Sequence, residues 1–476
     1  MAAIMGSAES GQVNDNSERR RIWRAAILYV ALTLVLAYPL TVDPARRVLS
    51  NGPDPTLFMW TLAWDAHAFV RQPLSIFDAN IYHPQHDTLA YSENLIGSAV
   101  FAAPVLWLTK NPALAINLVA LLSCVLCGLG VYVLARQVGV GAPGATLSGL
   151  IFAFSPPRFF RLSQLHLTTI QWVPFGLAFL HAYFERGRKR DLRLAALFFT
   201  LQALSSGHGT VFLAVAMLGL AGYHAARREP PALIKRVRDL GLLGALALAP
   251  ALLIVFPYRR VQVEMGLKRS LEDWAINWGS FLASPAHVQS FLLSLAPGAR
   301  INENAGAYLF PGYLPLLLAA AAAPRWGMTL TRPLPARRQD MTTFYLLLTL
   351  VGVLLSVGPP LGLWPLVYWL PGFNFIRVPS RFSMLALLGL AVLAGIGFNR
   401  LTARVAPRRR LMLATLAGVL LVAEFAAFPC ARNPTRARSP RSIGGSTVSP
   451  NRLRSRRSRS PIRGTLERPR GGRRCS

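Results

Sequence analysis

Apolar stretches and basic loops alternate along this chain, and one threading accounts for every Lys and Arg before position 429. A bilayer crossing needs about 20 apolar residues, and about eleven blocks approach or reach that length. With the N-terminus in the cytoplasm, the loops on that side carry 24 Lys and Arg in about 83 residues, against 13 in about 159 residues outside. This bias predicts an all-α, multi-pass membrane protein with large outer loops. The expected spans are 25–40, 114–135, 142–155, 166–184, 192–205, 210–225, 240–257, 304–323, 342–357, 382–398 and 411–428.

The apolar segment 95–109 is the ambiguous one. Counting it as a span would invert every later loop and place the basic stretch ERGRKRDLR outside. A segment of about fifteen apolar residues more often lies in the membrane surface than crosses the bilayer. We therefore expect a re-entrant or interfacial helix on the outer face, broken by Pro104.

The threading divides the chain into three parts. A cytoplasmic segment 1–24 precedes a polytopic domain 25–428, whose large outer loops are about 41–113, 258–303 and 358–381. Residues 1–17 are polar and no small-residue cleavage site follows the first apolar block, so we expect that block to stay as a signal anchor.

Composition narrows the class of protein further. With 53% hydrophobic and 15% charged residues, a soluble multidomain enzyme is disfavoured. Cys124 and Cys127 lie three apart inside an apolar span, where hydrocarbon disfavours the thiolate that redox chemistry needs. No zinc-type ligand spacing occurs, so no cofactor is expected, and a divalent metal is left open.

The tail 429–476 carries 14 Arg and one Glu and has no apolar periodicity, so it cannot bury a core. Three interpretations are weighed: a basic arm for nucleic acid, a segment bound to an anionic surface, and an out-of-frame translation of a GC-rich gene. The first conflicts with the outer location that the threading gives the tail, and no nucleic-acid partner is expected. We favour the third interpretation, under which the natural protein continues differently after about residue 428.

The first outer loop concentrates acidic and aromatic residues. Long connections are usually functional or disordered, and the aromatic content argues against disorder. Residues 57–70 have helical spacing and are expected to lie along the membrane surface, with Asp54 just before that helix. Asp54 is then either a simple helix cap or a functional carboxylate. The acids of this loop are Asp43, Asp54, Asp65, Asp78, Asp87 and Glu93.

Other outer loops supply cations on the side where the charge bias depletes them. Either these arginines snorkel to lipid headgroups, or their fork geometry binds phosphate oxygens. A carboxylate together with such arginines would suit a reaction on a phosphate-linked lipid, the carboxylate acting as general base and the arginines stabilising the departing phosphate. His208, in SSGHG, is interpreted as a loop histidine. The candidate substrate-binding residues are Arg158, Arg161, His166, Arg259, Arg377, Arg381 and Glu93.

The order of several short motifs resembles a known family. GPDPTLFMWTLAW, FDANIYHPQHDTLAYSEN, FAFSPPRFFRLSQLHL, QALSSGHG and LPGFNFIRVPSRF are similar to blocks of uncharacterised bacterial multi-spanning proteins assigned to the GT-C superfamily of membrane glycosyltransferases. The resemblance covers roughly 25–428. It implies a bacterial inner-membrane enzyme that transfers a sugar, with inversion, from a polyprenyl-phosphate donor to a glycan, lipid or protein acceptor on the outer face.

The superfamily's first-loop acid corresponds by position to Asp54, which the resemblance implies to be the catalytic base. Many members have paired acids at this place, whereas here Pro53 precedes Asp54 and no second acid adjoins it. Asp65, Asp78 and Glu93 remain alternative candidates for the base. The resemblance also implies an outer C-terminal domain, whose place the Arg-rich tail takes, so a truncated chain is expected. Two other functions stay open: a lipid-linked glycan transporter and a non-catalytic membrane assembly protein. The transporter is disfavoured because such proteins usually carry ionisable residues within their spans or internal repeats. Here Glu424 is the one acid placed well inside an expected span, and no internal repeat is visible.

Overall fold

A computed structural model describes most of the chain up to residue 426. The described residues are 12–48, 52–226, 230–266, 276, 278–295, 307–323, 341–359, 362–370, 373, 376, 378–426 and 435–436. By its internal contacts the chain divides into Met1–Ala437 and Arg438–Ser476, and all described residues belong to the first unit. The predictions made for the tail lie outside the described residues, apart from 435–436.

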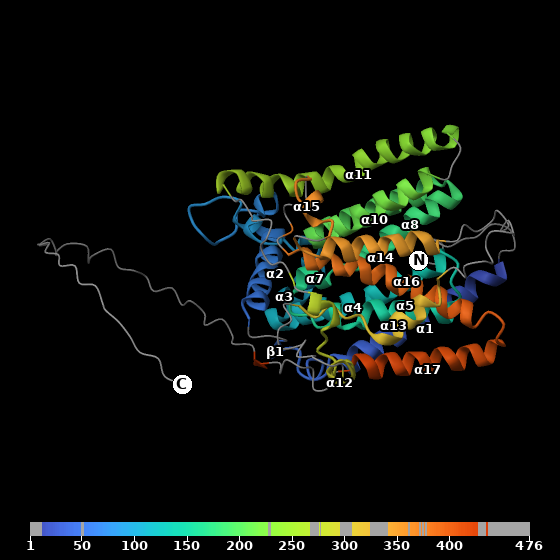
Figure 1. The fold of residues 1–476 in the computed structure, drawn as a ribbon. Coiled ribbons are helices and arrows are strands. Elements are labelled where there is room, and N and C mark those ends of the chain that lie inside the picture. The colour runs from blue at the N-terminus through green and yellow to red at the C-terminus, as the bar shows by residue number, and fades with distance from the viewer. Residues whose placement is uncertain are drawn as a thin grey trace, which may run out of the picture. The chain divides into compact units, whose positions relative to one another are not determined.

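The described chain is a bundle of helices (Figure 1). The long helices are α1 (Gln12–Leu36), α4 (Pro112–Gln137), α5 (Ala142–Phe154), α8 (Trp172–Arg186), α9 (Lys189–Ser205), α10 (Gly207–Ala225), α11 (Pro230–Glu264), α14 (Thr342–Ser356), α16 (Ser383–Leu401) and α17 (Pro407–Phe425). Shorter helical elements connect them: η2 (Pro73–Ser75), η3 (Thr88–Tyr91), α6 (Pro156–Phe159), α7 (Leu165–Thr168), η4 (Trp278–Leu282), α12 (His287–Ser294), α13 (Tyr313–Ala320), α15 (Trp364–Val367) and η5 (Pro379–Phe382).

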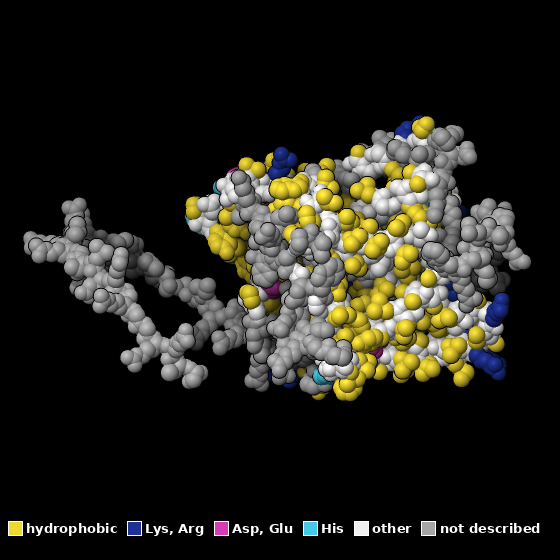
Figure 2. Space-filling view, in the orientation of Figure 1, with side chains coloured by type: hydrophobic (Ala, Val, Ile, Leu, Met, Phe, Trp, Pro, Cys, Tyr) yellow, Lys and Arg dark blue, Asp and Glu magenta, His cyan; other side chains and the backbone are white. Residues whose placement is uncertain are grey.

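The helices pack around one apolar core and also expose apolar side chains. Buried Leu, Val, Phe and Ala of α4, α5, α8 and α16 form the centre of the core. The outward faces of α1, α11 and α17 carry exposed residues such as Ile27, Leu253 and Leu416. Figure 2 shows hydrophobic side chains spread over the face on which α10, α14 and α17 lie, with Lys and Arg at its margins. Such a surface is stable in lipid and not in water, so this is a membrane protein.

The expected apolar blocks coincide with helices, while their number as spans stays a prediction. Within the part of the chain that the structure describes, three helices are long and apolar enough to cross a bilayer: Pro112–Gln137, Gly207–Ala225 and Pro379–Leu401. Several others are shorter than a full crossing, among them Ala142–Phe154 and Thr342–Ser356. The block expected at 166–184 is divided, because the short helix α7 ends at Thr168 and α8 starts at Trp172.

Two helices follow the first expected span. α2 (Pro53–Arg71) runs across the ends of the long helices rather than alongside them (Figure 1). α3 (Ile96–Thr109) packs on it and exposes apolar side chains such as Trp107 and Leu108. The expectation that Pro104 breaks this segment is wrong: the helix continues through it. Pro104 has no backbone N–H, so the carbonyl of Val100 has no hydrogen-bond donor from the next helical turn. Val100 lies on the exposed side of the helix.

Close contacts between helices depend on glycine. A Cβ at Gly149 would lie 2.1 Å from the Tyr29 hydroxyl and 2.4 Å from the Gly128 carbonyl. Tyr29 itself is fully buried and donates from that hydroxyl to the Thr146 carbonyl at 3.0 Å. Gly149 therefore lets α1, α4 and α5 meet at van der Waals distance.

The described strands form one short antiparallel pair. β1 (Arg47–Val48) pairs with β2 (Thr435–Arg436), with Arg47 opposite Arg436 and Val48 opposite Thr435. Asn117 of α4 supports β1, since its side-chain amide donates to the Arg47 carbonyl at 2.6 Å.

Candidate functional site

Asp54 lies in the first turn of α2 and contacts a segment 110 residues further along the chain. Gly52 is the N-cap of α2, and no side chain caps this helix end, so Asp54 is not a simple cap. Instead Gln164 Nε2 donates to Asp54 Oδ2 at 3.0 Å. Arg161 Nη1 donates in turn to Gln164 Oε1 at 3.2 Å. Half-buried Asp54 and Arg161 are thus joined through one amide.

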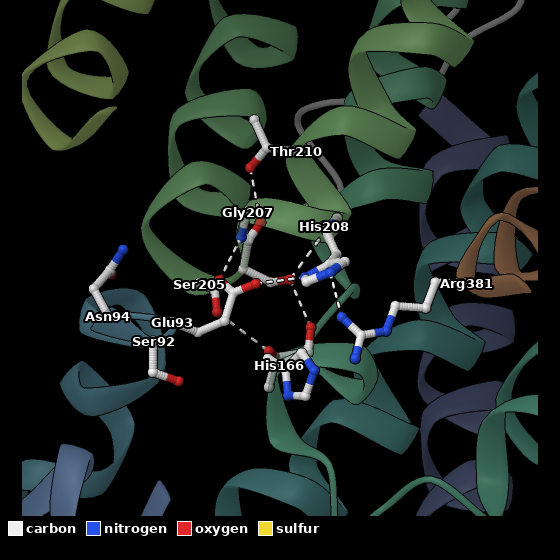
Figure 3. Close-up of polar contacts among 12 residues, drawn as sticks. Ser92, Glu93, Asn94, His166, Ser205, Gly207, His208, Thr210 and Arg381 are labelled. Carbon is white, nitrogen blue, oxygen red and sulfur yellow. Dashed lines mark hydrogen bonds and ion pairs between the residues drawn. The ribbon is translucent and has the colours of Figure 1, made fainter. Parts of the chain in front are cut away.

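Glu93 forms the second part of the site and is buried. Its Oε1 lies 2.5 Å from His208 Nδ1, and its Oε2 accepts from the Gly207 N–H at 2.8 Å. Gly207 and His208 start α10, so the carboxylate sits at the end of the helix where the dipole favours negative charge (Figure 3). Ser206 caps the same helix by accepting from the Gly209 N–H at 3.1 Å.

Arg381 approaches His208 from the opposite side (Figure 3). Its Nη1 lies 2.5 Å from His208 Nε2. A guanidinium has no acceptor, so this contact is a hydrogen bond when Nε2 is the unprotonated nitrogen of a neutral ring. Nδ1 then carries the proton and donates it to Glu93. Arg381 thus donates to His208, and His208 donates to Glu93. These two hydrogen bonds form a relay that runs in one direction, from the cation to the carboxylate.

The environment of Glu93 keeps it ionised. Burial by itself raises the pKa of this carboxyl group. His208, the Gly207 N–H and the charge of Arg381 oppose burial, and the net result is a pKa below the ordinary value. A negative Glu93 between a helix N-terminus and a cation is thus the stable state at neutral pH.

His166 connects the two parts of the site. Its ring centroid lies 5.4 Å from that of His208 and 5.0 Å from that of Phe58, one turn after Asp54 on α2. Its Nδ1 is buried without a hydrogen-bond partner among the described residues. Burial first, and then the nearby basic groups His208, Arg381 and Arg161, hold the pKa of His166 well below its usual range. A neutral imidazole with an unused nitrogen thus lies beside two arginines.

The structure brings together Asp54, Arg161, His166, Glu93 and Arg381 of the predicted site residues. Arg158 lies elsewhere: it is fully buried and donates to the carbonyls of Ala153 at 2.8 Å and Thr168 at 2.9 Å. These hydrogen bonds go to backbone carbonyls inside the protein, so a role of Arg158 in binding substrate stays a prediction.

The remaining predicted residues are spread more widely. Arg259 is an exposed residue of α11. Arg377 lies outside the described residues. The alternative base Asp78 accepts from the Asp87 N–H at 2.9 Å. The alternative base Asp65 is fully buried, and neither of its carboxylate oxygens has a hydrogen-bond partner among the described residues.

Two residues of this site were not among the predicted ones. Gln164, in SPPRFFRLSQLH, stands in no motif that marks it as a site residue. His208 is expected to be a loop histidine, although Ser206, two residues before it, is typical of the residue that precedes a helix start. That signal could have placed the imidazole at a helix N-terminus, but not beside Glu93.

A divalent metal was left open for this site. Among the described residues, no three His, Cys, Asp or Glu side chains come together as a metal ligand set. Asp54 is joined to a neutral amide and Glu93 to an imidazole and a backbone N–H. These side chains do not fit a divalent ion, and no step is derived through one.

Comparisons with known proteins give structural neighbours only. No family model matches, and no curated protein matches. The chain is similar to the arabinofuranosyltransferase AftD from Mycobacteria (16% identity, TM-score 0.48), covering 86% of this chain and 26% of that one. It is also similar to the oligosaccharyltransferase AglB of Archaeoglobus fulgidus with an inhibitory peptide and a dolichol-phosphate (14% identity, TM-score 0.43), covering 88% and 57%. An apo form of the Archaeoglobus fulgidus oligosaccharyltransferase gives 14% identity and a TM-score of 0.41, with 86% and 55% covered.

The chain thus spans between about a quarter and somewhat over half of the length of these neighbours. By name, the first is an arabinofuranosyltransferase and the other two are oligosaccharyltransferases. At these identities and TM-scores the similarities carry no conclusion about the activity of this chain.

Proposed function

We propose that the chain is a membrane glycosyltransferase that moves a sugar from a polyprenyl-phosphate donor to a hydroxyl acceptor. The reaction takes place on the extracytoplasmic face of the membrane, with Asp54 as the general base. The observation that carries the proposal is the meeting of a half-buried carboxylate, two arginines and a neutral imidazole at the end of the apolar bundle where α2 lies. A lipid-linked substrate would reach such a place from the bilayer.

Asp54 is the carboxylate of the first outer loop best suited to take a proton. Both oxygens of Glu93 accept hydrogen bonds, and an arginine salt bridge holds Asp87, with Arg260 Nη1 at 2.8 Å. Asp65 is sealed in the interior, where burial raises its pKa well above the usual range. Asp54 is half-buried, and its one hydrogen bond among the described residues comes from an uncharged amide.

The donor phosphate is assigned to Arg381, Arg161 and His166. A guanidinium offers several donors in a fixed fork, which suits phosphate oxygens. His208 and Glu93 would hold the Arg381 fork in one orientation, so that little reorganisation is needed when charge develops on the leaving phosphate. His166, kept neutral, can add a hydrogen bond without changing the charge of the site.

The reaction that follows is a single displacement. The acceptor hydroxyl loses its proton to Asp54 as its oxygen forms a bond to the anomeric carbon of the sugar. The bond from that carbon to the phosphate oxygen breaks on the opposite face, and polyprenyl phosphate leaves with the electron pair. Attack opposite the leaving group inverts the anomeric configuration. Removing a general base typically costs 10²–10⁴-fold in rate.

The test is donor breakdown by the full chain in detergent, supplied with radiolabelled polyprenyl-phosphate pentoses and hexoses and membrane acceptors. Asp54→Asn should lower turnover by about 100-fold or more and leave donor binding unchanged. Asp43→Asn is the matched control, because it removes a carboxylate from the same loop outside the site. Turnover retained by Asp54→Asn would remove this residue from its role. Donor that binds to the unmodified chain and stays intact would contradict the transferase and favour transport or assembly.

A further inference from the structure

A pocket of about 440 Å³ lies on α1, far from the site described above. Its lining residues are Asn16, Ser17, Arg20, Arg21 and Arg24. This part of α1 contacts the end of α4, where Arg136 binds Glu18, and Gln137 beside it contacts Glu185 near the end of α8. The candidate site lies at the start of α8 and α10, so the two regions are at opposite ends of the bundle.

The described lining of the pocket is positively charged. It contains three guanidinium groups, and no carboxylate of a described side chain lines it. Glu18, on the same helix, is held by Arg136 through two hydrogen bonds of 2.8 and 3.0 Å, which leaves Arg21 a longer contact of 3.4 Å. Arg20 and Arg24 have no ion-pair or hydrogen-bond partner among the residues that the structure describes. They are exposed and one helical turn apart, which lets both reach one anion.

The position of the pocket along α1 indicates where that anion comes from. Directly beyond it, α1 exposes the apolar side chains Ile27 (65%), Val30 (45%) and Leu34 (52%), which form a lipid-facing surface. Trp23, within the same turn as Arg24, is 69% exposed. Tryptophan and arginine side by side at the start of an apolar surface are typical of the headgroup level of a bilayer.

We propose that this pocket binds the headgroup of an anionic phospholipid, with Arg20 and Arg24 on the phosphate oxygens and Asn16 and Ser17 on headgroup hydroxyls. Two guanidinium forks match a phosphodiester in both charge and geometry. The same chemistry would accept free phosphate, but only a lipid can bring its phosphate to this depth while its chains cover Ile27 and Val30. A basic residue near an anionic membrane surface adds about 1 kcal/mol, or about fivefold in affinity.

The experiment uses the full chain in a zwitterionic detergent and counts bound lipids by native mass spectrometry. Phosphatidylglycerol should bind to the unmodified chain in preference to phosphatidylcholine of the same acyl composition. Arg20→Ala and Arg24→Ala should each weaken phosphatidylglycerol binding by about fivefold, and the double variant by about 25-fold. Arg19→Ala is the matched control: it removes the same charge from the same helix but does not line the pocket, and it should leave binding unchanged.

Three outcomes would overturn the proposal. Equal binding of the two lipids would show that the headgroup is not recognised. An effect of Arg19→Ala as large as that of Arg20→Ala would show a general charge effect and no pocket. Inorganic phosphate that displaces phosphatidylglycerol at millimolar concentration would make the free ion the ligand. Thermal unfolding of each variant in phosphatidylcholine micelles, expected to equal that of the unmodified chain, separates lost binding from lost folding.

Discussion

Arg381 Nη1 lies 2.5 Å from His208 Nε2, a contact that is a hydrogen bond only when this nitrogen of the imidazole carries no proton. Because arginine can only donate, the ring that fits this contact is neutral and protonated at Nδ1, the nitrogen that faces Glu93. Three residues from the first outer loop, the start of α10 and the segment before α16 therefore share one defined arrangement of protons.

The tautomer of His208 can be measured directly. In ¹⁵N-histidine-labelled protein, we expect the His208 signals to show a neutral ring with a protonated Nδ1. The protein has eight histidines, so the spectrum of His208→Gln assigns the signal by its absence. Gln can still accept from Arg381 and donate to Glu93, whereas His208→Leu leaves both charges without this partner and should cost about 3 kcal/mol of stability. A protonated ring at pH 7 would contradict the relay.

Replacing Glu93 should make the stability of the fold depend less on pH in the acid range. The pKa of Glu93 lies below its ordinary value of 4.5, so its ionised form stabilises the fold above that value. This contribution is lost as the pH falls through the lowered pKa. Glu93→Gln should therefore lower the melting temperature at pH 6–7, and its difference from the unmodified chain should shrink in the acid range. Glu264→Gln, on an exposed part of α11, should show no such pattern.

Asp65 should behave in the opposite way. Its pKa is raised well above 3.8 because burial disfavours the charge, so folding binds a proton that the unfolded chain releases above about pH 4. The unmodified chain should then lose stability relative to Asp65→Asn as the pH rises, by at most about 1.4 kcal/mol per pH unit. Melting temperatures of both proteins from pH 4 to 8 test this. Parallel curves would mean that Asp65 has a partner when charged.

The approach of α1, α4 and α5 gives a packing prediction. Gly149→Ala places a methyl group 2.1 Å from the Tyr29 hydroxyl and 2.4 Å from a backbone oxygen, and overpacking of this kind costs about 1–3 kcal/mol or more. Gly222→Ala on α10 is the matched control, because a Cβ there meets nothing within 4 Å. Loss of glycine flexibility should make that variant up to about 1 kcal/mol more stable. Thermal unfolding in detergent compares the two, and equal melting temperatures would contradict the close contact.

Much of the helical pattern could be predicted from local sequence. The block expected at 342–357 is α14 (Thr342–Ser356), and the block at 142–155 is α5 (Ala142–Phe154). In both cases an apolar run is bounded by polar residues, Gly or Pro, so hydropathy alone finds its ends. The start of α1 at Gln12 could not be found this way, because its first turns are polar and only their helical continuity joins them to the apolar part.

The candidate site was less accessible to such reasoning. Arg161, His166 and Arg381 could be selected because they are basic residues on a side that the charge bias depletes of Lys and Arg. Their partners could not, since Gln164 and His208 carry no pattern that points to Asp54 or Glu93. Spatial pairing over more than a hundred residues depends on how the helices pack, and one sequence by itself does not encode that packing in any local motif.

The Glu93 carboxylate also sets an order of events during synthesis of the chain. Its partner Gly207 follows 114 residues later, and Arg381 follows His208 by a further 173. The first outer loop is thus made long before the groups that neutralise its buried acid. Until α10 has been inserted, Glu93 must stay hydrated, and the loop around it cannot close. The ribosome has to pass residue 381 before the site can exist at all, so any nascent chain released earlier carries an open first loop.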